Sequence, residues 1–229
     1  MIQQRSGLHL LLLIGLLAGN EVLLAHAQVP FPGKCPEVKV MEDFDVEAYL
    51  GIWYEYSKYP FAFEIGKKCI YANYSIINNE TLSVVNGGIN RLTGNPSSIS
   101  GTAKVLGPAR LAVAFFPGQQ TTKPNYMVLG TDYESFSVVY SCTNVISLAN
   151  IKFAWILTRE REPTAATIAA AKEILADNKI SESFFIDTQQ SNCPKLDSNG
   201  TDFGAEDLTV GDPIDEFVGT VLPNAIEKA

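Results

Sequence analysis

The sequence predicts an all-β domain of eight antiparallel strands followed by one α-helix. Short runs rich in Val, Ile, Tyr, Phe and Thr fill the segment from Gly51 to Leu157, and such runs are typical of strands. Clusters of Gly, Pro and Asn separate the runs and mark turns. One segment with helical periodicity comes after the last run. This count of strands is compatible with a closed barrel or with a sandwich.

The expected strands are the apolar and β-branched runs between these turn signals. They span residues 52–58, 69–77, 81–89, 98–105, 109–116, 125–132, 135–142 and 150–158. The clearest turn signals are Asn78-Asn79, Gly94-Asn95-Pro96, Gly107-Pro108 and Pro117-Gly118. Together these runs and turns are those expected of an antiparallel all-β domain.

An amphipathic helix is expected after the strands. It begins at Pro163 and Thr164, which are typical helix-start residues, and it ends near Asp177-Asn178. Apolar residues recur on one face at helical spacing. They are Ile168, Ala171, Ile174 and Leu175. A short strand over 183–188 should follow the helix.

The N-terminal residues have the pattern of a secretory signal peptide. Arg5 precedes an apolar run from Leu10 to Leu17, and Ala25-His26-Ala27 is a small-x-small cleavage site. An uncleaved membrane anchor is the alternative, but the run is shorter than the ~20 apolar residues that a spanning helix needs. We therefore expect a signal peptide over 1–27, a folded domain over 28–195 and a secreted, extracellular protein.

Acidic residues dominate the C-terminal segment. Between Lys195 and Ala229, eight carboxylates face two lysines and supply −6 of the formal net charge of −8. Because this segment has few large apolar residues, we expect 196–229 to be a disordered tail. The remaining domain is close to neutral and has no basic stripe, so no nucleic-acid partner is expected.

Four cysteines in a chain bound for an oxidising compartment predict two disulfides. The cysteines are Cys35, Cys69, Cys142 and Cys193, and their number alone allows three pairings. Sequons predict N-linked glycans at Asn73, Asn79 and Asn199.

Three motifs, in order, resemble the signatures of the lipocalin family. The first is Gly51-Ile52-Trp53, the second is Thr131-Asp132-Tyr133, and the third is Arg159 at the end of the last strand. Further stretches are similar to the apolipoprotein D and Lazarillo branch of that family. They are Cys69–Ser75, Val139–Cys142, Phe153–Leu157 and Asn192–Lys195.

The resemblance implies a fold and a function. The fold is an eight-stranded up-and-down barrel with the helix packed outside, with Cys35 paired to Cys142 and Cys69 paired to Cys193. Trp53 and Arg159 would pack together across the closed end. The function implied is that of an extracellular carrier, which binds fatty acids, sterols, retinoids or similar lipids inside the barrel. The expected physiological roles are lipid transport and stress protection.

Strand alternation predicts the ligand-binding residues. An eight-stranded barrel can hold one small ligand, and alternate side chains point inward. A glycan on Asn73 would turn Ile70 and Tyr74 inward, and an inward Arg159 would do the same for Phe153 and Trp155. Tyr74 and Trp155 also match pocket positions of the resembled family. The full set is Tyr74, Trp155, Met127, Phe153, Ile70, Leu129, Val113 and Phe115. Each of these side chains could instead only fill the core.

The sequence offers no catalytic machinery. Both histidines, His9 and His26, fall in the expected signal peptide, which removes the commonest general base and metal ligand. We therefore expect no catalytic residue, cofactor or metal.

Two alternatives to a lipid carrier stay open: a signalling or adhesion protein that binds a cell-surface receptor through loops or tail, and a biliverdin-type pigment carrier. A lipoprotein or membrane surface is a further possible partner.

Overall fold

The computed structural model describes residues 30–119, 122–146 and 148–196. The expected signal peptide, the sequon at Asn199 and the acidic tail from residue 197 onward lie outside the described residues. No helix in the described part of the chain is long and apolar enough to cross a membrane.

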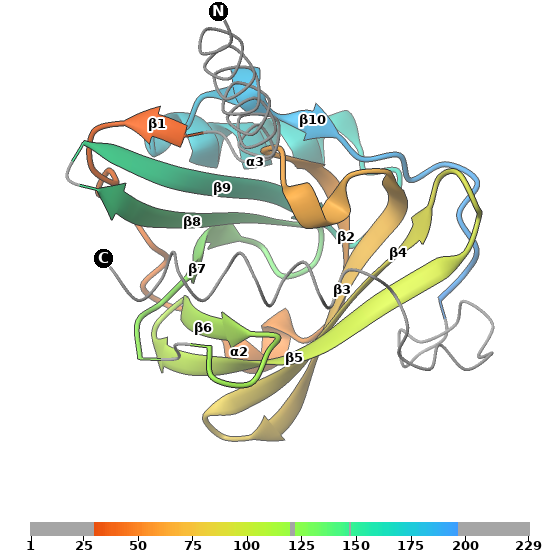
Figure 1. The fold of residues 1–229 in the computed structure, drawn as a ribbon, viewed down its shortest axis with the longest axis horizontal. Helices are drawn as coiled ribbons and strands as arrows, with labels where there is room; N and C mark the ends of the chain where they lie inside the picture. The colour runs from red at the N-terminus through yellow and green to blue at the C-terminus, as the bar shows by residue number, and fades with distance from the viewer. Residues whose placement is uncertain (1–29, 120–121, 147, 197–229) are drawn as a thin grey trace, which may run out of the picture.

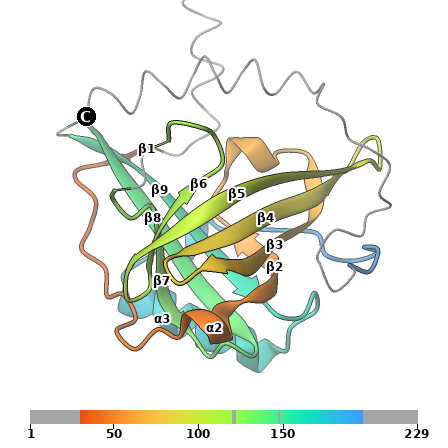
Figure 2. The ribbon, with the colours of Figure 1, turned by 90° about the horizontal axis from the view of Figure 1, so that it is seen from below.

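Eight antiparallel strands form a closed barrel, which confirms the predicted fold class (Figures 1 and 2). Each strand pairs with the next one along the chain, and β9 also pairs with β2, which closes the ring. The barrel strands are β2 (Gly51–Lys58), β3 (Lys67–Asn78), β4 (Thr81–Asn90), β5 (Pro96–Gly107), β6 (Arg110–Ala114), β7 (Tyr126–Thr131), β8 (Phe136–Ile146) and β9 (Ala149–Thr158).

Two short strands extend the sheet outside the barrel. β1 (Pro30–Pro32) pairs with β9, and β10 (Ile186–Asp187) pairs with β2. The strand expected over 183–188 is therefore only partly correct. Its first residues lie in the 3-10 helix η3 (Glu182–Phe184), because the Ser181 hydroxyl accepts a hydrogen bond from the Ser183 N–H and begins a tight turn.

One long helix packs on the outside of the barrel. α3 (Ala165–Asp177) begins after Thr164, whose hydroxyl accepts a hydrogen bond from the Thr167 N–H at 3.1 Å. Its apolar face covers the outer side of β7 and β8, and Figure 2 shows it outside the ring of strands. Ile168 and Leu175 are buried in this contact, as the apolar spacing of the sequence predicted.

A short helix precedes the barrel. α2 (Val46–Tyr49) begins at Asp45, whose carboxylate accepts hydrogen bonds from the N–H groups of Glu47 and Ala48. The chain then turns into β2 at Gly51, which has a φ of +90°. Only glycine adopts that conformation without strain, so the Gly of the first motif is required by the backbone.

Both disulfides join the pairs implied by the resemblance. Cys35 bonds to Cys142 of β8, and Cys69 of β3 bonds to Cys193. The first disulfide attaches the N-terminal segment to β8. The second fixes the C-terminal segment beside β3, so both ends of the described chain are tied to the barrel.

Candidate functional site

The two faces of the barrel wall differ in what their side chains pack against. An inner cluster includes Trp53, Leu111 and Val139. An outer cluster includes Val138, Tyr140 and the buried face of α3. Neighbouring residues of β8 thus belong to opposite clusters, as strand alternation requires. The inner cluster lines the barrel interior, which is the candidate site.

The exposure of inward-facing side chains differs between the two ends of the barrel. Tyr49, the last residue of α2, and Trp53 of β2 are 0% exposed. Asn86 of β4 lies two positions after Val84 of the inner cluster, so it faces inward, and so does Ile99 of β5, which pairs with it. The Ile99 side chain is nevertheless 38% exposed. An inward side chain reaches that exposure because solvent enters the barrel. The end near Ile99 is therefore the mouth, and the end at α2 is the closed end.

Arg159 seals the closed end. Its guanidinium carbon lies 3.6 Å from the centroid of the Trp53 ring. The same guanidinium donates hydrogen bonds to the carbonyl oxygens of Tyr133 at 2.8 Å, Ile52 at 2.9 Å and Ala48 at 3.1 Å. A single side chain thus joins α2, β2, β9 and the turn after β7, through a cation–π contact and charge-assisted hydrogen bonds.

The second motif, Thr131-Asp132-Tyr133, forms the turn between β7 and β8. The Asp132 carboxylate accepts a hydrogen bond from the Ser135 N–H at 2.8 Å, which is a common way for Asp to stabilise a turn. The Tyr133 hydroxyl accepts one from the Asp45 N–H at 2.9 Å. The motif therefore has a structural role, since it fixes the turn and holds α2 against the closed end.

Four aromatic rings gather at the mouth. Phe153 stacks on Trp155 with ring centroids 5.9 Å apart. Phe61 meets both rings edge-on, at 5.1 Å and 6.3 Å, and Phe63 lies 5.2 Å from Phe61. All four side chains are only partly buried. They form an apolar surface that a ligand can cover, and we call them the mouth aromatics.

A chain of hydroxyl groups lies deeper in the barrel. The Tyr49 hydroxyl lies 2.8 Å from that of Tyr126 and 3.0 Å from that of Ser137, and Tyr126 also hydrogen-bonds Tyr74. Burial raises the pKa of Tyr49 to about 12 and raises those of Tyr74 and Tyr126 as well. The phenols thus remain neutral and can each donate and accept a hydrogen bond.

The structure places most of the predicted site residues at the interior. Tyr74 belongs to the inner cluster, and Val113, Phe115 and Trp155 pack against it. Phe153 lies among the mouth aromatics. Ile70 is buried opposite Gly88 but belongs to neither cluster. Whether these side chains contact a ligand stays a prediction.

The inward orientation predicted for Met127 and Leu129 is wrong. Leu129 is part of the outer cluster and Met127 packs against it, whereas Val128 between them belongs to the inner cluster. Residues 126–129 are all apolar, because α3 covers the outer face of β7. A strand buried on both faces shows no alternation, so its sequence does not indicate which residues point inward.

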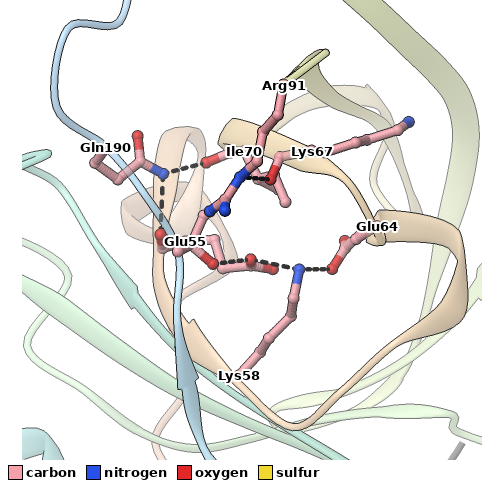
Figure 3. A network of polar contacts seen from close by, with 8 residues as sticks. Glu55, Lys58, Glu64, Lys67, Ile70, Arg91 and Gln190 are labelled. Carbon is pink, nitrogen blue, oxygen red and sulfur yellow. Dashed lines mark hydrogen bonds and ion pairs between the residues drawn. The ribbon is translucent and has the colours of Figure 1, made fainter. Parts of the chain in front are cut away.

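Sequence reasoning missed a group of charged residues inside the wall of the mouth (Figure 3). Glu55 pairs with Leu157 and Lys58 pairs with Trp155, so both face the interior. The Lys58 ammonium lies 2.7 Å from the Glu55 carboxylate and also contacts the carboxylate of Glu64. Glu64 belongs to η2 (Ala62–Glu64), in the loop between β2 and β3. We call these three residues the charged triad.

Burial gives the charged triad unusual electrostatics. The side chains of Glu55 and Lys58 are 3% and 5% exposed, against 15% for Glu64. Burial, reinforced by the negative charge of Glu64, raises the pKa of Glu55 to about 8, although Lys58 opposes the shift. Lys58 thus contacts two carboxylates, and burial makes that of Glu55 harder to ionise than an ordinary glutamate.

The only sequence signal for the triad was the presence of charged residues within an otherwise apolar strand. Period-two alternation puts Glu55 and Lys58 on opposite faces, since they are three positions apart. A register shift between Glu55 and Ser57 turns both inward. No residue in that stretch marks the shift.

The C-terminal segment completes the wall beside the triad. β2 and β3 pair from Gly51 and Tyr74 as far as Tyr54 and Tyr71, and beyond that point the two strands separate. The Gln190 side-chain amide bridges this gap, since it donates hydrogen bonds to the carbonyl oxygens of Glu55 at 2.9 Å and Ile70 at 2.7 Å. Figure 3 shows Gln190 reaching both strands.

Two buried oxygens near the interior have no hydrogen-bond partner among the described residues. They are Asn86 Oδ1 and Ser97 Oγ. Asn86 of β4 pairs with the inward-facing Ile99 of β5, and Ser97 lies two positions before Ile99 on the same strand. Both oxygens therefore lie on the inner face of β4 and β5. Buried polar atoms normally have a hydrogen-bond partner, so these two oxygens are exceptions on the inner face.

The described residues contain no group of three or more His, Cys, Asp or Glu placed to hold a metal ion. The site instead consists of apolar and aromatic walls with a few polar groups, which is the usual composition of a small-molecule pocket. Fold and site together define the class of this protein: a closed antiparallel β-barrel whose interior has the side-chain composition of a small-molecule site.

Comparisons with known proteins identify the family within that class. A family model for the lipocalin-like domain matches residues 44–190. Apolipoprotein D of Cavia porcellus is 42% identical over 188 residues, which cover 81% of this chain and 97% of that protein. The Lazarillo protein of Schistocerca americana is 30% identical over 163 residues, covering 69% and 75% of the two chains.

A solved structure agrees. Insecticyanin from the tobacco hornworm Manduca sexta superposes with a TM-score of 0.64 at 26% identity, over 72% of this chain and 90% of that one. The chain belongs to the lipocalin-like family.

Proposed function

We propose that this protein is a secreted carrier of small hydrophobic ligands, such as fatty acids, sterols or retinoids, which it holds inside the barrel. The observation that carries the proposal is the group of mouth aromatics. Phe61, Phe63, Phe153 and Trp155 are packed against one another yet only partly buried. Covering that apolar surface with a ligand contributes about 25 cal/mol per Å².

The polar groups of the interior support binding of an amphiphile. Tyr74 and Asn86 carry hydrogen-bonding groups on the inner face. They can orient a ligand whose apolar part packs on the mouth aromatics. The two disulfides fit an extracellular protein, and we infer that Asn73 and Asn79 carry glycans. A lipoprotein or membrane surface, or a cell-surface receptor, is the partner from which ligand would be exchanged.

Tryptophan fluorescence tests the proposal directly. The chain has two tryptophans, Trp155 at the mouth and Trp53 at the closed end. The purified protein is titrated with a fatty acid, a sterol, a retinoid and biliverdin. Saturable quenching by one class is the expected result and names the ligand group. Saturation by biliverdin alone would identify a pigment carrier.

A matched variant locates the signal. In Trp155→Phe only Trp53 emits, and this residue is fully buried beside Arg159. We expect the variant to bind ligand with much less quenching than the native protein. If no ligand class quenches the native protein, the barrel is a scaffold, and a receptor-binding role through the loops replaces the carrier function.

A further inference from the structure

The loop between β2 and β3 is held down over the mouth by one apolar and one ionic contact. Phe61 packs edge-on against Phe153 and Trp155. Glu64 reaches the Lys58 ammonium inside the wall, and Figure 3 shows this contact spanning the space between loop and strand. Phe61 covers part of the Phe153 and Trp155 rings, so a ligand that packs on those two rings from the same side must displace this loop.

The two carboxylates on Lys58 are not equivalent. Glu55 is fixed on β2, where it also accepts a hydrogen bond from the Thr188 hydroxyl, and its backbone carbonyl oxygen is held by Gln190. Glu64 is in a one-turn helix within a loop, and it is the most exposed member of the triad. Of the two, Glu64 is the carboxylate that can leave.

We propose that Lys58 is the docking point for the carboxylate of an anionic amphiphile, such as a long-chain fatty acid, which takes the place of Glu64 on the Lys58 ammonium. This inference rests on the proposed carrier function and specifies its ligand class. The exchange is one carboxylate for another, so the buried charge of Lys58 stays compensated when the loop opens. A neutral ligand would leave Lys58 with Glu55 alone, and a poorly compensated buried charge is unfavourable.

The position of Lys58 suits an amphiphile. Lys58 pairs with Trp155 across β2 and β9, so its side chain leaves the wall next to one of the mouth aromatics. A carboxylate on Lys58 would therefore allow the adjoining hydrocarbon chain to pack against the aromatic rings. The head group and the chain of one ligand would be recognised by neighbouring parts of the same wall.

A matched pair of probes separates the charge contribution from the apolar one. Oleic acid and oleyl alcohol have the same hydrocarbon chain and differ in the carboxylate. Their dissociation constants are measured with the native protein and with Lys58→Met, Glu64→Gln and Lys152→Met. Lys152→Met is the control, since it makes the same change on β9 but on the outer face, where Lys152 lies over Phe31.

The ratio of the two dissociation constants is the readout within each variant. In the native protein, oleic acid should bind about tenfold tighter than oleyl alcohol, the scale of one charge-assisted hydrogen bond. Lys58→Met should abolish this preference and Lys152→Met should keep it. Glu64→Gln should increase it, because an internal competitor for Lys58 is removed.

The controls keep the proposal falsifiable. Because Lys58 is buried, folding of Lys58→Met is checked by near-ultraviolet circular dichroism. Glu64→Gln changes a more exposed side chain and provides an independent test. An unchanged ratio in both variants would overturn the Lys58 docking point while leaving the carrier function intact. If the native protein bound neither probe nor any other lipid, the proposed function itself would fail.

Discussion

The guanidinium carbon of Arg159 lies 3.6 Å from the centroid of the Trp53 ring, at the closed end of the barrel. The same group donates three hydrogen bonds to backbone carbonyl oxygens. The two residues are far apart in the sequence and join the first and the last barrel strands. Their contact stabilises the end of the barrel opposite the mouth.

Replacing Arg159 should therefore reduce stability more than binding. Arg159→Met removes the cation–π contact and leaves three carbonyl oxygens without this donor, so we expect the free energy of unfolding to fall by about 2–4 kcal/mol. Urea denaturation measures the change. Arg110→Met is the control: the Arg110 side chain is exposed and donates a hydrogen bond to the Pro108 carbonyl oxygen two residues away, so its loss should cost less than about 0.5 kcal/mol. Equal effects of the two variants would argue against a stabilising role for Arg159.

Removing either disulfide should destabilise the native state. The bonds join residues 107 and 124 positions apart, and closing loops of that length restricts the unfolded chain. The double variants Cys35→Ser/Cys142→Ser and Cys69→Ser/Cys193→Ser should each lose about 2–5 kcal/mol. An unchanged melting temperature in either variant would contradict this.

Trp155→Ala should weaken ligand binding and leave the barrel folded. Loss of a large aromatic surface at the mouth should raise the dissociation constant about tenfold or more. Displacement of a fluorescent fatty acid measures this without relying on tryptophan emission. The control is Phe184→Ala, because Phe184 is 39% exposed and packs against Phe31 and Tyr59 outside the barrel. The same loss of affinity in both variants would remove Trp155 from the site.

Glu55 should make stability depend on pH. Burial raises its pKa from 4.5 to about 8, so between these values the native state binds more protons than the unfolded chain. The free energy of unfolding should therefore fall as the pH rises through this window. Glu55→Gln cannot ionise, and the native protein should lose stability relative to it from about pH 5 to about pH 9. Urea denaturation across this range tests the sign. A native protein that gained stability relative to the variant would show that Glu55 is charged in the fold.

The sequence predicted the parts of the structure that depend on local chemistry. The eight strands and the helix followed from apolar runs and turn residues. The contact of Arg159 with Trp53 required the family resemblance, since nothing in the spacing of residues so far apart indicates that they touch.

The candidate site was harder to predict because its geometry depends on irregular backbone. Met127 was assigned to the wrong face because α3 buries the outer side of its strand. Lys58 was missed because a register shift places it on the same face as Glu55. Phe61 lies in a loop, where alternation gives no orientation. The only sequence feature that could have indicated a role for this loop is the apolar run Phe61-Ala62-Phe63 directly after Pro60.

The bridge made by Gln190 has a consequence for biosynthesis. β2 and β3 are the first two barrel strands to be synthesised, yet the gap between them is closed by a residue 120 positions after Ile70. The wall beside the charged triad therefore cannot be completed while the chain is still being elongated through the barrel strands. Closure of this part of the wall therefore follows synthesis of the C-terminal segment, which the Cys69–Cys193 disulfide fixes beside β3.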